Sequence, residues 1–353
     1  MAEIEPDAFE FDDDEGLAGD TGSSTASVAS SILRGYEEYG RTFAALGRGD
    51  YGMPVDELEL DRIDQKHRLY TILLGEKLFL APINPNVQRV LDLGTGSGIW
   101  AIDIADEYPS AEVLGNDLAP SQPDWVPPNC RFEIDDVEEL WTYRTKFDFI
   151  HARDFLFSIH DWPKLINQCY EFNTPNGYTE LQCLLPVPNC DDGSAPPTSG
   201  VVTFSTKIIE ASQICGWSLL EPNNYKRYME EAGFVDVTEV RFKIPTGPWP
   251  KDLTMKLLGA FETQSLMKGA SAFSLRSFAK AYGWTQEQTE LFLMDLRRDV
   301  RDMRFHTYYE FIVVHGRKPD DDPHIIPEPE SPPSESGSDG KRSSRSPPET
   351  VDS

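Results

Sequence analysis

The segment from Val90 to Trp100, VLDLGTGSGIW, limits the fold of this chain more than any other part of it. It begins with the apolar pattern of a short buried strand, continues with glycines at alternate positions, and ends where an apolar helical pattern opens. A glycine turn between a strand and a helix N-terminus lets the backbone approach a ligand and points free N–H groups at it. The segment therefore predicts a nucleotide-cofactor site. Its candidate residues are Asp92, Gly94, Thr95, Gly96 and Gly98.

The spacing of these glycines distinguishes two kinds of cofactor. A dinucleotide fingerprint needs G-x-G-x-x-G, and counting from Gly94 places Ile99 where the third glycine should stand. The pattern found here, D-x-G-x-G-x-G, resembles the first motif of the class I S-adenosylmethionine (SAM) methyltransferases. That resemblance implies that the loop holds the methionine part of SAM. A dinucleotide oxidoreductase is the alternative, and Ile99 argues against it.

Acidic residues end the next two predicted strands. The strand AEVLGNDL ends at Asp117 and Leu118, and an acid about 20 residues after the first glycine typically binds ribose hydroxyls. A third strand, CRFEIDDV, ends in Asp135, Asp136 and Val137. In the family that this chain resembles, an acid here contacts the adenine amino group, and we favour Asp136 because it directly precedes the apolar residue. The alternative for any one of these acids is a helix cap or a solvated turn.

Later segments contribute further candidates. FDFIHARDF predicts the central strand after the topological switch, where ligands of α/β sheets bind, so His151 and Arg153 are expected at the site. The triplet that begins at His160 is similar to the H-D-W of plant small-molecule O-methyltransferases, and this resemblance implies that His160 is a general base. The alternative is a bystander histidine in a helix cap, with Asp161 as the N-cap. Glu180, in the fifth predicted strand, also has a position from which it could face the site.

A helical segment is predicted before the glycine loop, over residues 28–80. Within it, YGMPVDELELDRIDQKHRLY followed by GEKLFLAPI resembles the fungal LaeA-type methyltransferases, as do FEIDDVEELW and TGPWPKD further along. The resemblance covers most of residues 34–318 and implies an enzyme or a regulator of secondary metabolism. In related folds such a segment closes over SAM, although local ion pairs on a solvated helix face are the alternative for its polar residues. Its polar candidates are Arg41, Tyr51, Asp61, Arg62 and His67.

The two ends of the chain differ from the rest in composition. Residues 1–20 and 320–353 hold 18 of the 60 acidic residues in a chain of net charge −28. Such segments cannot bury enough apolar surface to offset the entropy of ordering, so we expect them to be disordered. The expected organisation is an acidic tail (1–30), a methyltransferase domain (31–319) and a second tail (320–353). Within the domain we expect a helical cap (31–85), a SAM-binding core (86–185) and a substrate-side insertion with the C-terminal strands (186–319).

Composition also excludes several classes of partner. The acidic balance argues against nucleic acid or an anionic membrane, and no stretch approaches the ~18 apolar residues of a membrane span. The five cysteines show no C-x-x-C spacing, which favours reduced thiols over a metal site or disulfides. With no signal peptide in view, the expected location is the cytoplasm, with the nucleus as the alternative.

Beyond the predicted core, helices are expected at about 251–268 and 285–304, the second with a capping box from Thr285 to Gln288. Residues 186–200 predict a loop that could act as a mobile lid. The resemblance implies a doubly wound α/β sheet of seven strands, Rossmann-like, with the last strand antiparallel. The expected reaction is SN2 transfer of a methyl group from SAM to a small-molecule acceptor of the secondary-metabolite type, accelerated by alignment and by exclusion of water. The alternative is a SAM-binding regulator that acts through protein partners of the velvet type.

Overall fold

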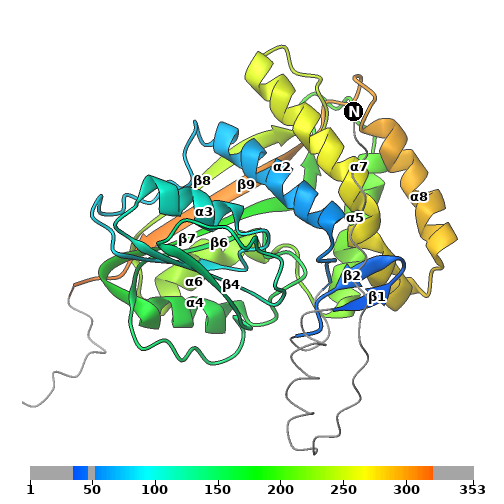
Figure 1. Ribbon diagram of the computed structural model, residues 1–353. Helices are drawn as coiled ribbons and strands as arrows, with labels where there is room; N and C mark the ends of the chain where they lie inside the picture. The colour runs from blue at the N-terminus through cyan, green and yellow to red at the C-terminus, as the bar shows by residue number, and fades with distance from the viewer. Residues whose placement is uncertain (1–34, 47–51, 321–353) are drawn as a thin grey trace, which may run out of the picture. The chain divides into compact units, whose positions relative to one another are not determined.

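The structure, a computed structural model, describes residues 35–46 and 52–320 (Figure 1). The expectations for Tyr51 and for the two tails, apart from Asp320, fall outside these residues. The described chain begins with a hairpin of β1 (Tyr36–Glu38) and β2 (Arg41–Phe43). The two residues between these strands both have positive φ angles, as a two-residue hairpin turn requires. The prediction of helix over 28–80 is therefore wrong for the hairpin and correct for α2 (Glu57–Leu73).

The main sheet confirms the predicted doubly wound topology. Its strands are β3 (Arg89–Leu93), β4 (Glu112–Asp117), β5 (Cys130–Ile134), β6 (Phe147–Arg153), β7 (Asn173–Asn189), β8 (Val235–Pro245) and β9 (Tyr308–Arg317). Their order is β5-β4-β3-β6-β7-β9-β8, with β3 parallel to β4 and β6. The last strand, β9, is antiparallel to both of its neighbours, as expected. The chain reverses its progression between β3 and β6, so the loops that follow these two strands lie at the switch point where ligands bind.

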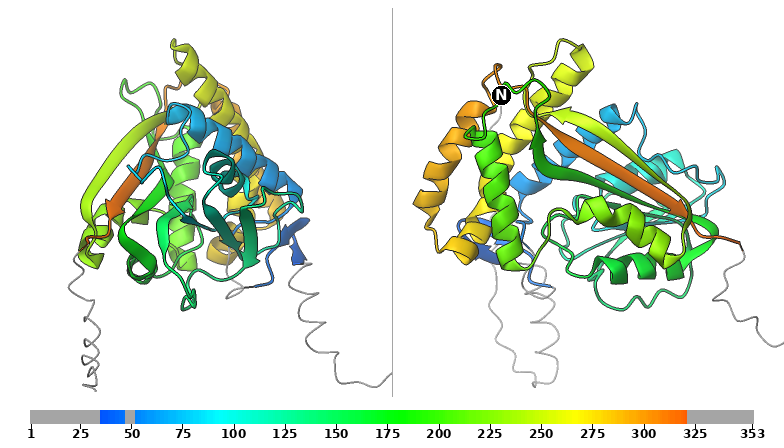
Figure 2. Two further views of the ribbon diagram at one scale, coloured as in Figure 1. Left: turned by 60° about the vertical axis from the view of Figure 1, so that its left-hand side comes forward. Right: turned by 180° about the vertical axis from the view of Figure 1, so that it is seen from behind.

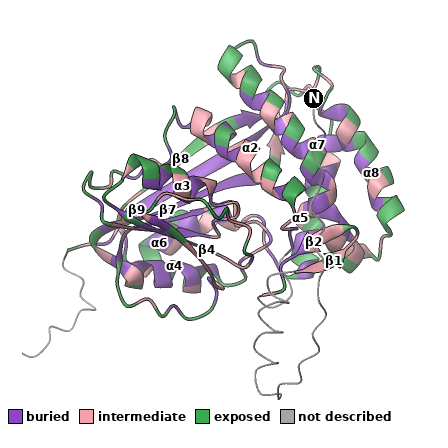
Figure 3. Ribbon diagram, viewed as in Figure 1, coloured by how far each residue is buried: buried purple, intermediate pink, exposed green. Residues whose placement is uncertain are grey.

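Helices cover both faces of this sheet. They are α3 (Ile99–Glu107), α4 (Trp162–Phe172), α5 (Gly200–Cys215), α6 (Tyr225–Ala232), α7 (Leu253–Tyr282), α8 (Gln286–Asp299) and the short 3-10 helix η1 (Glu221–Asn224). Along β3, Val90 packs in the cluster under α3, whereas Leu91 packs in the cluster that includes α4 and α6. This alternation follows from the two-residue period of a strand and buries both faces of the sheet. The inner strands β3, β6 and β9 are accordingly mostly buried, whereas the edge strands β5 and β8 and the outer sides of α7 and α8 are partly exposed (Figure 3).

A helical layer lies beside one end of the long strands β7, β8 and β9. It consists of α5, α7 and α8, and α2 packs against α7 (Figures 1 and 2). The 30-residue α7 extends well beyond the predicted 251–268 and passes through Gly259 and Gly269, whereas α8 is shorter than predicted and has the predicted capping box. No helix in the described part of the chain is long and apolar enough to cross a membrane.

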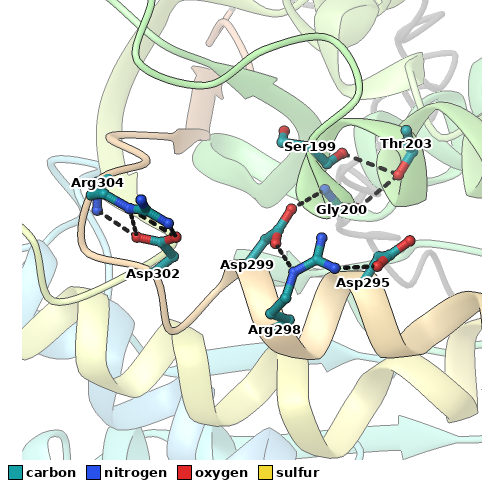
Figure 4. Close-up of polar contacts among 8 residues, drawn as sticks. All are labelled: Ser199, Gly200, Thr203, Asp295, Arg298, Asp299, Asp302 and Arg304. Carbon is teal, nitrogen blue, oxygen red and sulfur yellow. Dashed lines mark hydrogen bonds and ion pairs between the residues drawn. The ribbon is translucent and has the colours of Figure 1, made fainter.

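The start of α5 is joined to the end of α8 by a carboxylate. Asp299 Oδ2 accepts a hydrogen bond from the backbone N–H of Gly200 at 2.6 Å (Figure 4). Its other oxygen pairs with Arg298, which also pairs with Asp295. The first N–H groups of a helix have no partner within the helix, and the adjacent Ser199 makes no side-chain cap. Asp299 therefore supplies from α8 the cap that α5 lacks in its own sequence.

Candidate active site

The glycine loop between β3 and α3 has left-handed backbone at each glycine. Gly94, Gly96 and Gly98 have φ angles of 58°, 59° and 83°. Space also requires glycine at two of these positions, because a Cβ at Gly94 would lie 2.6 Å from the Phe155 ring and one at Gly98 would lie 2.5 Å from the Phe132 ring. The alternate glycines thus let the loop lie between two aromatic rings that larger residues would push away.

Asp92 holds this loop in place. One carboxylate oxygen accepts from Thr95 Oγ1 at 2.6 Å, and the other lies 2.8 Å from His151 Nδ1. The imidazole of His151 stacks on Trp100 with ring centroids 3.7 Å apart, and burial lowers its pKa. Both oxygens of Asp92 therefore have partners within the chain, and the predicted residue His151 supports the loop from beneath.

The predicted cofactor residues line one cavity. It contains about 1560 Å³ of space free of protein atoms, part of which is open to solvent. Gly98, the N-cap of α3, is the one predicted cofactor residue outside the lining. The predicted residues in the lining are Asp92, Gly94, Thr95, Gly96, Asp117, Leu118, Asp135, Asp136, Val137 and Arg153.

The acidic end of the cavity is formed by β4 and β5. Asp117 Oδ2 accepts from the Gly96 N–H at 2.8 Å, and its Oδ1 accepts from a backbone N–H two residues further on. Burial raises the pKa of Asp117 to about 6. Asp135 and Asp136 follow the neighbouring strand, each accepting from a backbone N–H of its own turn. Acids from two separate parts of the sequence thus lie at the ends of two adjacent strands.

The opposite side of the glycine loop is formed by the end of β6. There Arg153 and Asp154 both line the cavity. The hydroxyl of Tyr70 donates to Asp154 Oδ2 at 2.5 Å, and the backbone N–H of Leu184 donates to Oδ1 at 2.9 Å. Asp154 has a φ of 54°, an uncommon conformation for a residue with a side chain, and these two contacts hold it. The contact with Tyr70 joins the cap helix α2 to the strand end at the cavity.

The rest of the cavity is an apolar chamber beneath α2 and α7. Six of the apolar residues that line it are Phe155, Phe157, Leu184, Phe204, Ile208 and Leu266. Two pairs of charged residues lie in its wall: Arg62 with Glu59 at 2.5 Å, and Lys66 with Glu262 at 2.7 Å. Because the members of each pair have opposite charges, this part of the cavity suits a ligand with little net charge.

Two predicted residues lie away from this cavity. His160 is in a second pocket near Trp217, with its Nδ1 2.9 Å from Glu138 Oε2. Glu180 is fully buried and accepts from the backbone N–H groups of residues 80 and 81, so it fastens the segment that leads into β3. The hypothesis that His160 is the general base stays a prediction, one to which the cavity lends no support.

Of the polar candidates before the loop, Arg62 is the one that lines the cavity among the described residues. Arg41 pairs with Asp56, the N-cap of α2, and thereby ties the hairpin to this helix. Asp61 is exposed. His67 lies behind Arg153, with its Nδ1 3.0 Å from an Arg153 nitrogen.

Sequence reasoning missed the groups that close the chamber. Lys66 and Glu262 are 196 residues apart, so no spacing in the sequence links them. Tyr70 and Asp154 are similarly distant, at 84 residues. A signal was available for Asp154 alone, since it directly follows the predicted Arg153 at a strand end facing the site.

Comparison with known proteins agrees with this geometry. A family model described as a methyltransferase domain matches residues 65–239. Methyltransferase pytC of Aspergillus terreus is 40% identical over 301 residues, which is 85% of this chain and 93% of pytC. The secondary metabolism regulator LAE1 of Cochliobolus heterostrophus is 33% identical, with 80% of this chain and 95% of LAE1 covered. The probable methyltransferase tdiE of Emericella nidulans is 32% identical, with 74% and 83% covered.

Both lines of observation agree on the family. The order of the strands, the glycine loop and the acids at the ends of β4 and β5 have the arrangement that the sequence motifs implied. The relatives match over most of their own length and include enzymes as well as a regulator. The chain therefore belongs to the class I S-adenosylmethionine-dependent methyltransferases, in the fungal LaeA-type family.

Proposed function

We propose that this methyltransferase acts on a small, mostly apolar acceptor that binds in the same cavity as SAM. The observation that carries the proposal is the division of that cavity. The glycine loop and three acids form one part, and an apolar chamber with paired charges forms the other. A lining that joins the glycine loop and the acids to an apolar wall supports a mostly apolar small-molecule acceptor beside the cofactor.

The residues of the first part fit SAM. Gly94 and Gly96 both line this part of the cavity, and their left-handed backbone suits a loop that lies against a ligand. Asp117, at the end of β4, has the position from which an acid contacts ribose hydroxyls. Asp136 and Val137, after β5, supply a carboxylate and an apolar surface for the base. We propose that these residues hold the nucleoside.

SAM, when bound, supplies a methyl group that is already activated on a sulfonium. The protein's own contribution is to align the acceptor and to exclude water. The ion pair between Lys66 and Glu262 closes the chamber between α2 and α7. Tyr70 and Asp154 provide a hydroxyl and a carboxylate in the lining, which an acceptor hydroxyl can contact.

The cofactor part of the proposal can be tested by calorimetry with S-adenosylhomocysteine, the demethylated product. We expect the wild-type protein to bind it and Asp117→Ala to bind it about 10- to 100-fold more weakly, the loss typical of a hydrogen bond to a charged group. Asp124→Ala, which removes an exposed acid from the same region, is the matched control and should bind normally. Equal affinities for all three proteins would contradict the assignment of Asp117.

The acceptor part can be tested with SAM that carries a deuterated methyl group, incubated with an extract of fungal metabolites. We expect a small molecule to gain the mass of the labelled methyl group. Leu266→Trp fills the chamber and should abolish this product while S-adenosylhomocysteine still binds; Leu253→Trp, on the exposed side of α7, should not. Label that enters protein alone would refute a small-molecule acceptor.

A regulator that binds SAM and acts through protein partners is the second candidate, because LAE1 carries that description. It predicts binding of S-adenosylhomocysteine without any labelled small molecule, so the same pair of experiments separates the two. For location we propose the cytoplasm, with the nucleus as the alternative. The five cysteines, all free, support an intracellular protein.

A further inference from the structure

Arg153 lies next to the glycine loop, at the same edge of the sheet. Leu93 of β3 pairs with Ala152 of β6, so Gly94 and Arg153 follow at the same edge of the sheet. The guanidinium lines the cavity that the loop also lines. It is held 5.4 Å above the Tyr70 ring. Arg153 is thus fixed beside the loop, with access to the ligand space.

This guanidinium has no acidic partner. Within residues 35–46 and 52–320, its one hydrogen-bond contact is between Nη2 and His67 Nδ1, at 3.0 Å, and no carboxylate forms an ion pair with it. Arg62 in the same cavity wall differs, because Glu59 binds it through two nitrogens. Burial lowers the pKa of Arg153 even though Asp154 and Asp92 act against it through space, whereas Glu59 outweighs burial and raises the pKa of Arg62. A buried cation without a carboxylate in direct contact is costly, so a bound anion would relieve it.

His67 orients Arg153 without neutralising it. The Nε2 of His67 lies 2.8 Å from the carboxylate of Asp103, on α3, which assigns the proton to that nitrogen. Nδ1 is then an acceptor for the Arg153 N–H. Burial and the charge of Arg153 lower the pKa of His67, against the opposing effects of Asp103 and Asp64. A neutral imidazole therefore fixes the direction of the guanidinium and leaves its charge free for a ligand.

The order of strands places this charge at one end of an elongated ligand. Along the edge of the sheet lie the acids of β5, then the acid of β4, then the glycine loop after β3, then Arg153 after β6. A nucleoside held by the acids has its substituent directed toward the loop and the guanidinium. In SAM that substituent ends in an amino acid, whose α-carboxylate is the one carboxylate of the molecule.

We propose that Arg153 binds the α-carboxylate of the cofactor, with His67 as its positioning residue; this rests on the proposed placement of the nucleoside. A guanidinium can bind a carboxylate through two parallel hydrogen bonds, and such charge-assisted pairs are strong. A carboxylate on the acceptor would have the same chemistry. The test must therefore distinguish a carboxylate on the cofactor from one elsewhere.

Two nucleosides make this distinction: S-adenosylhomocysteine, which has the amino acid, and 5′-methylthioadenosine, which lacks it. We expect the wild-type protein to bind S-adenosylhomocysteine more tightly by calorimetry. In Arg153→Met the affinity for S-adenosylhomocysteine should fall about 10- to 100-fold, while that for 5′-methylthioadenosine stays within about twofold. Arg153→Lys should recover part of the loss. Arg68→Met, an exposed arginine on α2, is the matched control and should leave both affinities unchanged.

Each result has a defined meaning. An equal fall for both nucleosides in Arg153→Met would show a structural role and overturn the proposal. An unchanged affinity for S-adenosylhomocysteine would also overturn it and leave an acceptor carboxylate as the partner. If the wild-type protein binds neither nucleoside, the proposed function itself fails, together with this inference.

The positioning role of His67 has its own measurement. In His67→Phe, which removes the acceptor for Arg153, the ratio of the two affinities should fall toward that of Arg153→Met. His67→Gln keeps an acceptor and a donor on one side chain, and should restore most of the ratio. No restoration by glutamine would limit His67 to a packing role.

Discussion

The ammonium of Lys66 lies 2.7 Å from the carboxylate of Glu262, and the two side chains are only 6% and 1% exposed. This ion pair joins α2, near the start of the domain, to α7, near its end. Lys66→Met should lower the free energy of unfolding by about 3–5 kcal/mol, because it leaves Glu262 charged and buried without a partner. The double variant Lys66→Met/Glu262→Met should recover most of this loss in urea denaturation. A double variant no more stable than Lys66→Met would show that the charge was not the cause.

Gly98→Ala should destabilise the protein and weaken cofactor binding. Its φ of 83° disfavours any side chain, and the new Cβ would lie 2.5 Å from the Phe132 ring. Gly193→Ala is the matched control, since Gly193 has a φ of 69° with no atom within 4 Å of the new Cβ. We expect a cost of about 1–2 kcal/mol for the control, from the backbone alone, and a larger one for Gly98→Ala. Similar melting temperatures for the two variants would mean that Phe132 moves aside freely.

Asp117 and Glu180 should each contribute stability at low pH that is lost as pH rises through the mildly acidic range. Burial raises the pKa of Asp117 to about 6 and that of Glu180 to about 7. Both exceed the ordinary carboxyl values, so between about pH 4 and 7 each of these two groups binds more protons in the folded state than in the unfolded state, and its contribution to the free energy of unfolding decreases with pH. The difference in melting temperature between the wild-type protein and Asp117→Asn should therefore shift against the wild-type protein as pH rises across this range. A difference that does not change with pH would contradict the raised pKa of Asp117.

Asp299→Ala should cost about 1–2 kcal/mol, the usual effect of removing a helix cap. The carboxylate of Asp299 accepts from the first N–H of α5 and is almost wholly buried (Figure 4). Asp302→Ala, which breaks a pair with the exposed Arg304, is the control and should leave stability almost unchanged. Chemical denaturation of both variants measures the difference. Equal effects would show that the contact with α5 is not what stabilises this joint.

The cofactor part of the site could be predicted from the sequence because its determinants are local. Gly94 and Gly96 follow a recognisable strand, and Asp117 and Asp136 each end the next strand along the chain. Parallel strands bring their carboxyl ends to one edge of a sheet, so the residues that follow such strands can be expected to lie near one another at that edge. Arg153 was predicted on the same ground. The structure adds that no carboxylate forms an ion pair with its guanidinium among the described residues.

The chamber could not be predicted in this way, because its contacts join distant segments. The helix predicted at about 251–268 includes Gly259 and ends directly before Gly269. In the structure both lie inside α7, where a Cβ at Gly259 would be 2.1 Å from the Gly247 carbonyl oxygen. Glycine there serves close packing of backbone on backbone, a purpose that no local pattern distinguishes from a helix end.

The match to the family model ends at residue 239, before α7 begins at Leu253, whereas the alignment with pytC covers 85% of the chain and includes α7. This helix carries Glu262 and Leu266, which line the chamber that we propose for the acceptor. Substitutions along α7 are therefore expected to change the acceptor while the residues proposed for the methyl donor stay the same. Relatives that keep the glycine loop and differ along α7 are the series in which to compare reaction products.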